Sequence, residues 1–433
     1  MFWKIIYNFL FVQIGRIYYY EQIIFNEKVN NSYRLRQETF TELKKIRQAC
    51  VNAEKIIMIH SSSVGEFEQA RPVISLIKKK YPSARVVCSF YSPSGFHFAK
   101  KIKNEIDGVV LLPLDTYPRM RRFMNILKPD MIFFMRYDLW PNLIWRAAKN
   151  QIPMYILNGT IRENSLRANG KNKIMRSFFK SFYKYISRVF VISEADKLRY
   201  SNIVDSDKII VAVDSRYDIV ALKAANAAFD EPVFKTLGPQ KSKFRIFVAG
   251  STYIDEDKIL MPAVKKLKSK YADFKYIVVP HELQPERIDS LKKLCEESGL
   301  SFVCESAAPE PEDYLKCDVV IYDKIGALYK IYKLADVVFV GGSFHGSIHN
   351  IMEPAVYSKL ILFGPTHRNA YEALIFKERQ AAECFNNSAE LENIIDAYFS
   401  DNTSKYKSFP EKAKQIVDEN LGCAEKIFSY IFN

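Results

Sequence analysis

The sequence predicts an α/β protein of two Rossmann-like, doubly wound domains that face a central cleft. Two observations lead to this prediction. The chain has 433 residues, which is too many for one ordinary core and suggests two domains of about 200 residues each. Short apolar, β-branched runs alternate with helical patterns in both halves, and this alternation is typical of parallel sheets covered by helices. The hydrophobic fraction of 48% is sufficient for two cores.

The expected strands of the first half are Ile56–His60, Arg85–Phe90, Val109–Leu112, Met131–Met135, Met154–Leu157, Val189–Ser193 and Ile209–Val213. Helical patterns separate them, as in Glu68–Lys80 and Asn142–Asn150. The second half continues with expected strands Arg245–Ala249, Tyr276–Val279, Val319–Tyr322, Val337–Val340 and Leu360–Phe363. Strand periodicity lapses between Tyr217 and Lys243, where Pro232, Gly238 and Pro239 occur, so we expect the linker there.

The first 25 residues are rich in aromatic residues and isoleucine, but Lys4, Arg16 and Glu21 interrupt them. No stretch reaches the roughly 20 apolar residues that span a bilayer. No small-residue cleavage site follows, which argues against a secretory signal. We expect a helix lying in the membrane interface, with an amphipathic core helix as the alternative.

Basic residues are concentrated in the first half of the chain. Residues 1–220 hold 36 Lys and Arg against 19 Asp and Glu, a net charge of +17, whereas the remainder has a net charge of −3. This asymmetry implies an anionic partner for the first half: nucleic acid, an anionic membrane or a phosphorylated substrate. The seven cysteines show no CxxC pair or metal spacing, so we expect reduced thiols and no zinc site.

A glycine-rich segment follows the strand Val337–Val340. It runs from Gly341 to Pro354, and Asn350 and Glu353 open an expected helix. Glycines allow the backbone to approach a ligand closely, and N–H groups at a helix start favour a phosphate. The carboxylate one turn into the helix is placed to accept hydrogen bonds from ribose hydroxyls. An ordinary βα turn with a structural glutamate is the alternative.

Glu66 lies at the end of one predicted strand and the start of a helix. A partly desolvated carboxylate there suits a general base that removes a proton from an acceptor hydroxyl. The alternative is that Glu66 only stabilises its helix N-terminus. Arg136 and Arg216 follow two other strands, where arginines can bind phosphate or carboxylate, although structural salt bridges also explain them. The acidic triplets at 205–207 and 255–257 are not expected to bind metal, because they lie in a short loop and at a helix start.

Short motifs are ordered along nearly the whole chain. In the first half they are His60–Glu66, Ser92–Gly95, Leu111–Asp115, Asp138–Leu143 and Ser193–Asp196. In the second half they are Ala249–Thr252, Val279–Glu282, Ile325-Gly326, Gly341–Ser343, His349–Pro354 and Phe363–Pro365. No single motif is decisive, but the ordered set is highly specific. It resembles the 3-deoxy-D-manno-octulosonic acid (Kdo) transferases of lipopolysaccharide synthesis.

The resemblance implies a glycosyltransferase of the GT-B fold that moves Kdo from CMP-Kdo to a lipid A precursor by an inverting, metal-independent reaction. It implies that Glu66 is the general base, and that Arg136 and Arg216 stabilise the transition state. The nucleotide-binding positions then are Pro280, His281, Ile325, Gly326, Ala327, Asn350, Ile351, Met352 and Glu353. Many members carry a carboxylate at the position of Arg136, and Ala327 replaces a residue that is often Glu.

The resemblance also implies three segments with different tasks. Residues 1–25 form a membrane-associating segment, 26–220 an acceptor-binding domain and 221–433 a nucleotide-sugar-binding domain, whose last helix is a candidate for crossing back. Expected partners are CMP-Kdo, a lipid A precursor and an anionic membrane surface, with no cofactor or metal. The expected location is the cytoplasmic face of the bacterial inner membrane, where the protein is peripheral or anchored by residues 1–25.

Three other functions compete with this prediction. The nearest is another GT-B enzyme, such as a UDP-sugar transferase or an epimerase. A second is an inactive membrane-peripheral binding protein of the same fold, which the departure at Arg136 makes conceivable. The third, nucleic-acid binding, rests on charge alone, because no recognised motif supports it.

Overall fold

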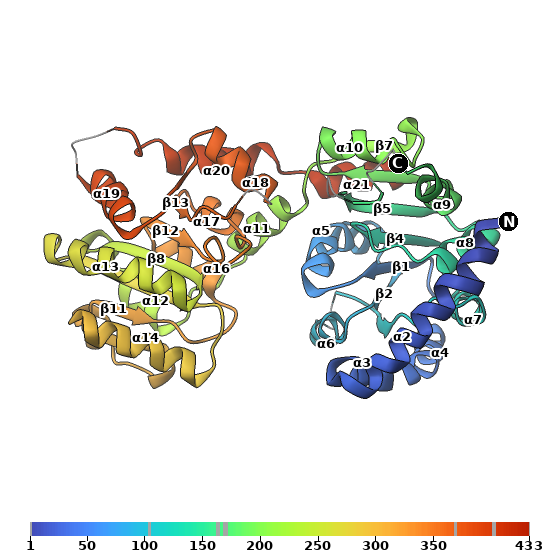
Figure 1. The fold of residues 1–433 in the computed structure, drawn as a ribbon, viewed down its shortest axis with the longest axis horizontal. Helices are drawn as coiled ribbons and strands as arrows, with labels where there is room; N and C mark the ends of the chain where they lie inside the picture. Colours follow the sequence, from blue (N-terminus) through green and yellow to red (C-terminus); the bar gives the residue numbers. More distant parts are fainter. Residues whose placement is uncertain are drawn as a thin grey trace. The chain divides into compact units, whose positions relative to one another are not determined.

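The computed structural model describes residues 2–102, 105–161, 165–167, 172–367, 370–400 and 404–432. The chain forms two compact units, Met1–Ile219 with Gly422–Asn433, and Val220–Leu421 (Figure 1). Each unit contains a seven-stranded sheet in which all paired strands are parallel. The two doubly wound α/β domains predicted from the sequence are thereby confirmed.

The sheet of the first unit has the strand order β3-β2-β1-β4-β5-β6-β7. Its strands are β1 (Ile56–Ser61), β2 (Arg85–Phe90), β3 (Gly108–Leu111), β4 (Met131–Met135), β5 (Met154–Gly159), β6 (Arg188–Val191) and β7 (Ile209–Val211). The order reverses between β1 and β4, so the loops after these strands diverge to opposite faces. In open α/β sheets, ligands bind at such a switch point, outside the carboxyl ends of the strands.

Helices cover both faces of this first sheet. Those described are α3 (Glu27–Gln37), α4 (Thr39–Ala49), α5 (Val64–Lys80), α6 (Pro93–Lys101), α7 (Tyr117–Leu127), α8 (Pro141–Lys149), α9 (Lys173–Tyr183), α10 (Glu194–Tyr200) and α21 (Cys423–Phe432), with a 3₁₀ turn at Ser206–Lys208. One core contains side chains of α4, α7, α8 and α9. The other contains side chains of α5, α6 and α21, so the last helix of the chain completes a face of the first sheet.

The N-terminal segment is almost continuously helical, with α1 (Phe2–Ile6), a π-helical turn (Tyr7–Phe11) and α2 (Val12–Phe25). It is attached to the first unit by hydrogen bonds from Trp3 Nε1 to Ser177 Oγ (2.8 Å) and from Tyr7 Oη to Asp115 Oδ2 (2.8 Å). Its other side chains remain largely exposed, among them Phe9, Ile17 and Ile24. Within the described part of the chain, no helix has the length and hydropathy needed to cross a membrane.

The sheet of the second unit has the order β10-β11-β9-β8-β12-β13-β14. Its strands are β8 (Arg245–Thr252), β9 (Phe274–Pro280), β10 (Phe302–Cys304), β11 (Val319–Ile321), β12 (Val337–Val340), β13 (Leu360–Phe363) and β14 (Ala382–Cys384). The switch point lies between β8 and β12. The strands expected from the sequence do not include β10 and β14, which are three-residue strands at the sheet edges and too short to show a periodicity.

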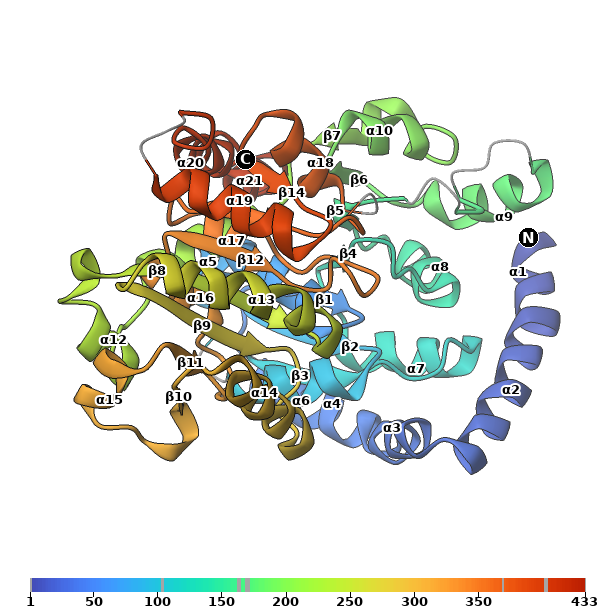
Figure 2. The ribbon, with the colours of Figure 1, turned by 60° about the vertical axis from the view of Figure 1, so that its left-hand side comes forward.

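The helices of the second unit begin with α11 (Arg216–Ala225), which contains the division between the units, and α12 (Pro232–Leu237). The stretch expected as a linker therefore contains two helices, and Val233, Phe234 and Leu237 of α12 are buried. The others are α13 (Ile254–Lys270), α14 (Pro285–Ser298), α15 (Pro311–Lys316), α16 (Leu328–Ile331), α17 (Met352–Ala355), α18 (Tyr371–Glu378), α19 (Ser388–Phe399) and α20 (Phe409–Glu419), with 3₁₀ turns at Lys241–Lys243, Glu305–Ala307 and Tyr332–Leu334. Helices α13, α14 and α19 pack on one face of the sheet (Figure 2).

Candidate active site

Glu66 and Arg136 lie at the switch point of the first sheet. Glu66 is in the first turn of α5, which follows β1, and Arg136 directly follows β4. Because β1 and β4 are paired neighbours, both residues lie at the same sheet edge. The structure thus brings together two of the three residues expected to be catalytic.

The Glu66 carboxylate has one occupied and one available oxygen. Its Oε2 accepts a hydrogen bond from the Ser62 backbone N–H at 2.6 Å, while Ser63 Oγ accepts one from the Glu66 N–H at 3.4 Å. This arrangement is close to a capping box, so Glu66 stabilises the N-terminus of α5. The other oxygen, Oε1, accepts no hydrogen bond from the described residues and is available for a proton.

Burial changes the basicity of Glu66. The side chain is only 7% exposed, and this burial raises the pKa of its carboxyl group. The hydrogen bond from Ser62 acts in the opposite direction but does not cancel the effect, and Asp138 raises the pKa further. A carboxylate with a raised pKa is a better general base near neutral pH than an exposed one.

A buried polar network adjoins Glu66. His60 is 0% exposed; its Nδ1 is 2.8 Å from Ser89 Oγ, and its Nε2 is 2.9 Å from Asp138 Oδ2. Trp140 Nε1 is also 2.9 Å from His60 Nε2, and Ser62 Oγ donates to the same oxygen of Asp138. Although burial works to raise the pKa of Asp138, the hydrogen bonds from its partners hold that pKa below the ordinary value. Asp138 is therefore a fixed negative charge beside the candidate base.

Arg136 has an unusual backbone conformation and an unsatisfied side chain. Its φ of +59° lies in the left-handed region, which is uncommon for a residue with a side chain. The backbone is held by hydrogen bonds to Leu157 O (2.8 Å) and from Tyr200 Oη (3.3 Å). Its Nε is buried without a hydrogen-bond partner among the described residues. A cationic N–H in that state is suited to an anionic ligand.

Arg216 also belongs to the first unit, and its side chain is held by the buried carboxylate of Asp214. Its Nε and Nη2 donate to Asp214 Oδ2 at 2.8 and 2.7 Å. Burial works to raise the pKa of Asp214, but Arg216 outweighs it and lowers that pKa, and Arg136 contributes in the same direction. The Asp214 carboxylate thus couples the two arginines electrostatically.

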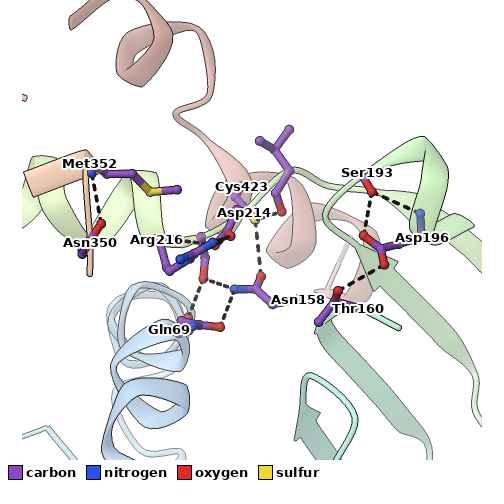
Figure 3. A network of polar contacts seen from close by, with 12 residues as sticks. Gln69, Asn158, Thr160, Ser193, Asp196, Asp214, Arg216, Asn350, Met352 and Cys423 are labelled. Carbon is purple, nitrogen blue, oxygen red and sulfur yellow. Dashed lines mark hydrogen bonds and ion pairs between the residues drawn. The ribbon is translucent and has the colours of Figure 1, made fainter. Parts of the chain in front are cut away.

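A second buried network fixes the loop that carries Arg216 (Figure 3). Asn158, at the end of β5, donates from Nδ2 to Gln69 Oε1 (3.1 Å) and to Ser215 Oγ (2.6 Å). Ser215 Oγ in turn donates to the backbone oxygen of Gln69 at 2.9 Å. Gln69 lies on α5, one turn after Glu66. The network therefore joins Ser215, the residue before Arg216, to α5, the helix that carries Glu66.

The glycine-rich loop of the second unit is held in part by a carboxylate of the protein itself. The N–H groups of Gly342 and Phe344 donate to Oε2 and Oε1 of Glu256, each at 3.0 Å. Glu256 lies in the first turn of α13 and is 0% exposed. At the start of the four-residue helix α17, the Met352 N–H donates to Asn350 Oδ1 at 3.0 Å. These three amides therefore already have partners, and the phosphate-binding helix start stays a prediction.

Four stacked rings form the most distinctive surface of this second edge. Tyr253, which follows β8, lies parallel to His345 with ring centroids 4.4 Å apart, and His281, which follows β9, is 4.6 Å from His349. Tyr253 and His281 are also 4.9 Å apart. Burial, and then the charge of His281, lowers the pKa of His349 to about 4. Flat rings with N–H donors at a switch point suit a nucleotide. The described residues include no group of three side chains arranged to hold a metal ion.

The residues expected to bind nucleotide are distributed over three segments of the second unit. Pro280 ends β9 and His281 follows it, while Asn350, Ile351, Met352 and Glu353 lie at the short helix α17. Ile325 is 92% exposed, Gly326 has a φ of +94°, and Ala327 is buried. Asn350 Nδ2 is 3.4 Å from Glu353 Oε1. Tyr253, His345 and His349 are absent from the predicted nucleotide-binding set, although each follows the end of a strand.

Comparison with known proteins shows which enzymes the chain resembles. The family model described as 3-deoxy-D-manno-octulosonic-acid transferase (kdotransferase) matches residues 34–219. A 3-deoxy-D-manno-octulosonic acid transferase of Rickettsia felis is 29% identical over 372 residues, which cover 85% of this chain and 77% of the relative. Over most of its length the chain is therefore similar to Kdo transferases. Like these relatives, it is a glycosyltransferase.

Two further comparisons concern the sequence relatives and the fold. The enzyme of the same name from Haemophilus influenzae is 26% identical over 380 residues, 87% of this chain and 86% of the relative. Among solved structures, the UDP-GlcNAc 2-epimerase of Neisseria meningitidis is similar, with a TM-score of 0.58, 14% identity and coverage of 85% of this chain and 99% of that one. This likeness concerns the GT-B fold alone.

Proposed function

We propose that this protein transfers Kdo from CMP-Kdo to a hydroxyl of a lipid A precursor. The observation that carries the proposal is the buried Glu66 carboxylate at the switch point of the first sheet, with a raised pKa and one available oxygen. Similarity to Kdo transferases supports the choice of sugar and of the lipopolysaccharide pathway.

The proposed reaction is a single inverting displacement. Glu66 accepts the proton of the acceptor hydroxyl, whose oxygen forms a bond to the anomeric carbon of Kdo. The bond from that carbon to the phosphate oxygen breaks, and CMP leaves with the electron pair. Asp138 keeps a negative charge near Glu66 and so maintains its basicity.

Each unit, taken by itself, carries groups suited to one part of the donor. In the first unit, Arg136 has an unsatisfied buried Nε that matches the carboxylate of Kdo, and Arg216 supplies a second guanidinium. In the second unit, the exposed imidazoles of His281 and His345 can donate to phosphate, beside rings on which a base can stack. With these groups, we propose that transfer needs no metal. An excess of EDTA is expected to leave the rate unchanged.

The acceptor and the location are proposed from the first unit. Its net charge of +17 over residues 1–220 favours a phosphorylated lipid, and the exposed apolar side chains of α1 and α2 favour the interfacial region of a bilayer. We therefore place the protein at the cytoplasmic face of the inner membrane.

Glu66→Gln tests the mechanism. The amide oxygen of glutamine can still accept from Ser62, so the helix start is preserved while the base is lost. The expected result is a decrease in kcat of about 10²–10⁴-fold, measured by mass spectrometry of products from CMP-Kdo and a tetra-acylated acceptor. Glu194→Gln, which changes an exposed first-turn acid of α10, is the matched control and should retain the wild-type rate. Near-normal transfer by Glu66→Gln would contradict the proposal.

Two other functions give different results. A UDP-sugar transferase or epimerase would be stabilised against heat by UDP rather than by CMP, since a ligand stabilises only the fold that binds it. We expect stabilisation by CMP. An inactive binding protein would bind CMP and produce no Kdo-containing product at any enzyme concentration.

A further inference from the structure

The first unit contains a cavity of about 910 Å³ beside the candidate active site. The N-terminal segment forms one wall with Phe11, Gly15 and Tyr18, and loops at the sheet edge supply Tyr91 and Trp140. The surface of the lining is mainly apolar, although polar and charged residues such as Arg16, Gln22 and Asp115 also contribute to it. Its volume is typical of sites that bind a small molecule.

Gly15 keeps this cavity open. It lies inside α2, where glycine is disfavoured relative to alanine. A Cβ atom built at Gly15 meets no heavy atom within 4 Å, so a larger side chain has room to enter the cavity without displacing the backbone. The position therefore allows the cavity to be filled experimentally.

A basic hollow of about 410 Å³ adjoins the apolar cavity and shares Tyr19, Arg36 and Leu114 with it. Arg119 and Arg122 also line this hollow. Neither of them forms an ion pair with a carboxylate of the described residues. An apolar cavity next to unpaired guanidinium groups is complementary to an amphiphile with an anionic head.

Arg36, on the shared wall, is a buried cation without a counterion. It is 8% exposed, and its guanidinium donates to the backbone oxygens of Leu112 (3.0 Å), Ser32 and Tyr91. No carboxylate in the described chain forms an ion pair with it. A buried charge is costly unless it is paired, so this wall favours an anion.

Trp140 connects the cavity with the candidate base. One part of the indole lines the cavity, while its Nε1 is 2.9 Å from His60 Nε2. His60 is hydrogen-bonded to Asp138, which also accepts a hydrogen bond from the Ser62 hydroxyl. The backbone N–H of Ser62 in turn donates to the Glu66 carboxylate. A ligand in the cavity would therefore contact Trp140, which is hydrogen-bonded to the network around Glu66.

We propose that the cavity binds one acyl chain of the acceptor and that Arg36, Arg119 and Arg122 bind a phosphate of the same molecule. This subsite rests on the proposed function, because it assigns the lipid acceptor to particular residues. It would align the sugar hydroxyl with Glu66 by fixing the chain and the phosphate at two points.

Quenching of tryptophan fluorescence tests the cavity without any donor. The probe is a lysophosphatidic acid with a bromine at the end of its acyl chain, used below its micelle concentration. Of the three tryptophans, only Trp140 lines the cavity, so binding is expected to quench its emission saturably. Gly15→Phe should weaken this binding at least tenfold, whereas Gly15→Ala, the matched control, should not. Equal binding by the two variants would overturn the proposal.

A second pair of variants tests the part of the site that is proposed to bind the phosphate. Arg119→Ser should weaken binding of the brominated lysophosphatidic acid at least threefold and leave binding of the equivalent monoacylglycerol unchanged. Arg121→Ser, on the same helix but outside both hollows, should change neither. Glycerol phosphate, which has the head but no chain, should not compete. Equal effects of the two arginine substitutions would overturn the phosphate assignment.

The outcomes also separate this inference from the proposed function. If the cavity assignment is wrong, Gly15→Phe binds the probe as well as Gly15→Ala does, while the wild-type protein still transfers Kdo. If the proposed function is wrong, no variant transfers Kdo, and the difference in probe binding between the two Gly15 variants persists.

Discussion

Asn158 joins Gln69 to Ser215, the residue before Arg216, through two hydrogen bonds from a single amide group. It is 2% exposed and has a φ of +53°, a conformation that Asn and Asp tolerate better than other residues with side chains. Aspartate therefore fits the backbone of Asn158 but cannot donate to Gln69 or Ser215.

We expect Asn158→Asp to lower the free energy of unfolding of the first unit by at least about 1–3 kcal/mol, because buried polar groups lose their partners. Urea unfolding followed by tryptophan fluorescence measures this unit, since Trp3, Trp140 and Trp145 all belong to it. Asn172→Asp is the control, because either residue can cap α9. A stability equal to that of the wild type would show that the network is dispensable.

His349 makes the second unit sensitive to acid. Its folded-state pKa of about 4 lies below the ordinary value of 6.5, so the unfolded chain binds more protons between these values. The stability of the second unit should therefore be fully present above pH 6.5 and should fall as the pH decreases toward 4.

His349→Phe is expected to reduce this pH dependence, because phenylalanine can keep the ring stack and does not titrate. Unfolding of the second unit is measured at pH 4.5 and 7. It is the transition that circular dichroism detects and tryptophan fluorescence does not, because all three tryptophans belong to the first unit. His97→Phe, on the surface of the first unit, should leave that dependence unchanged. An identical pH dependence in His349→Phe and wild type would contradict the assignment.

The site residues differ in how far the sequence predicts them. Glu66, Arg136 and Arg216 each follow the end of a strand, which is a local signal. The network of His60 and Asp138 requires that β1 and β4 be paired in a particular register, in which His60 lies opposite Phe134. The rings of Tyr253, His281 and His345 likewise come together only because β8, β9 and β12 are neighbours. Pairing between distant strands is not visible in a local pattern.

At the scale of elements, the glycine-rich loop also shows that a local sequence pattern does not reveal contacts with distant residues. The strand Val337–Val340 was predicted with its correct bounds, because an apolar run ending in two glycines is a strong local signal. The occupation of the loop amides depends on Glu256, more than 80 residues earlier in the chain. Its carboxylate reaches the loop because α13 follows β8, and β8 is paired with β12. The local pattern therefore predicts the loop but not the carboxylate that accepts hydrogen bonds from its amides.

The helix α21 is another element whose place depends on distant residues. The backbone N–H groups of Gly422 and Ala424 donate to Asp218 at 2.8 Å each, and Ile427 is 0% exposed in the core that α5 lines. Figure 1 shows this red helix among the elements of the first unit.

We expect Ile427→Ala to lower the free energy of unfolding of the first unit by about 2–5 kcal/mol, as truncation of a buried isoleucine does. Ser429→Ala, on the exposed side of the same helix, should change it by less than about 0.5 kcal/mol. The tryptophan-detected urea transition reports both values. A shift confined to the second unit would contradict the assignment of α21.

At the scale of the whole molecule, the uneven charge predicts how the protein binds lipid surfaces. The +17 of residues 1–220 should attract vesicles that contain phosphatidylglycerol, and salt should weaken this attraction, because the screening length falls to about 3 Å at 1 M.

Co-sedimentation at about 0.05 and 0.5 M NaCl should therefore show a loss of binding to anionic vesicles and little change for phosphatidylcholine vesicles. Replacement of the exposed Ile17 and Ile24 by serine should weaken binding to both kinds of vesicle. Binding to anionic vesicles that is independent of salt would rule out the electrostatic contribution.

The return of α21 to the first sheet has a consequence for synthesis on the ribosome. The second unit is one continuous stretch of chain and has all its residues once Leu421 has emerged. The first unit begins earlier but lacks a helix of its core until residues 422–433 have been translated. Its apolar face on α5 therefore stays open to chaperones during most of translation, and limited proteolysis of stalled nascent chains would reveal this delay.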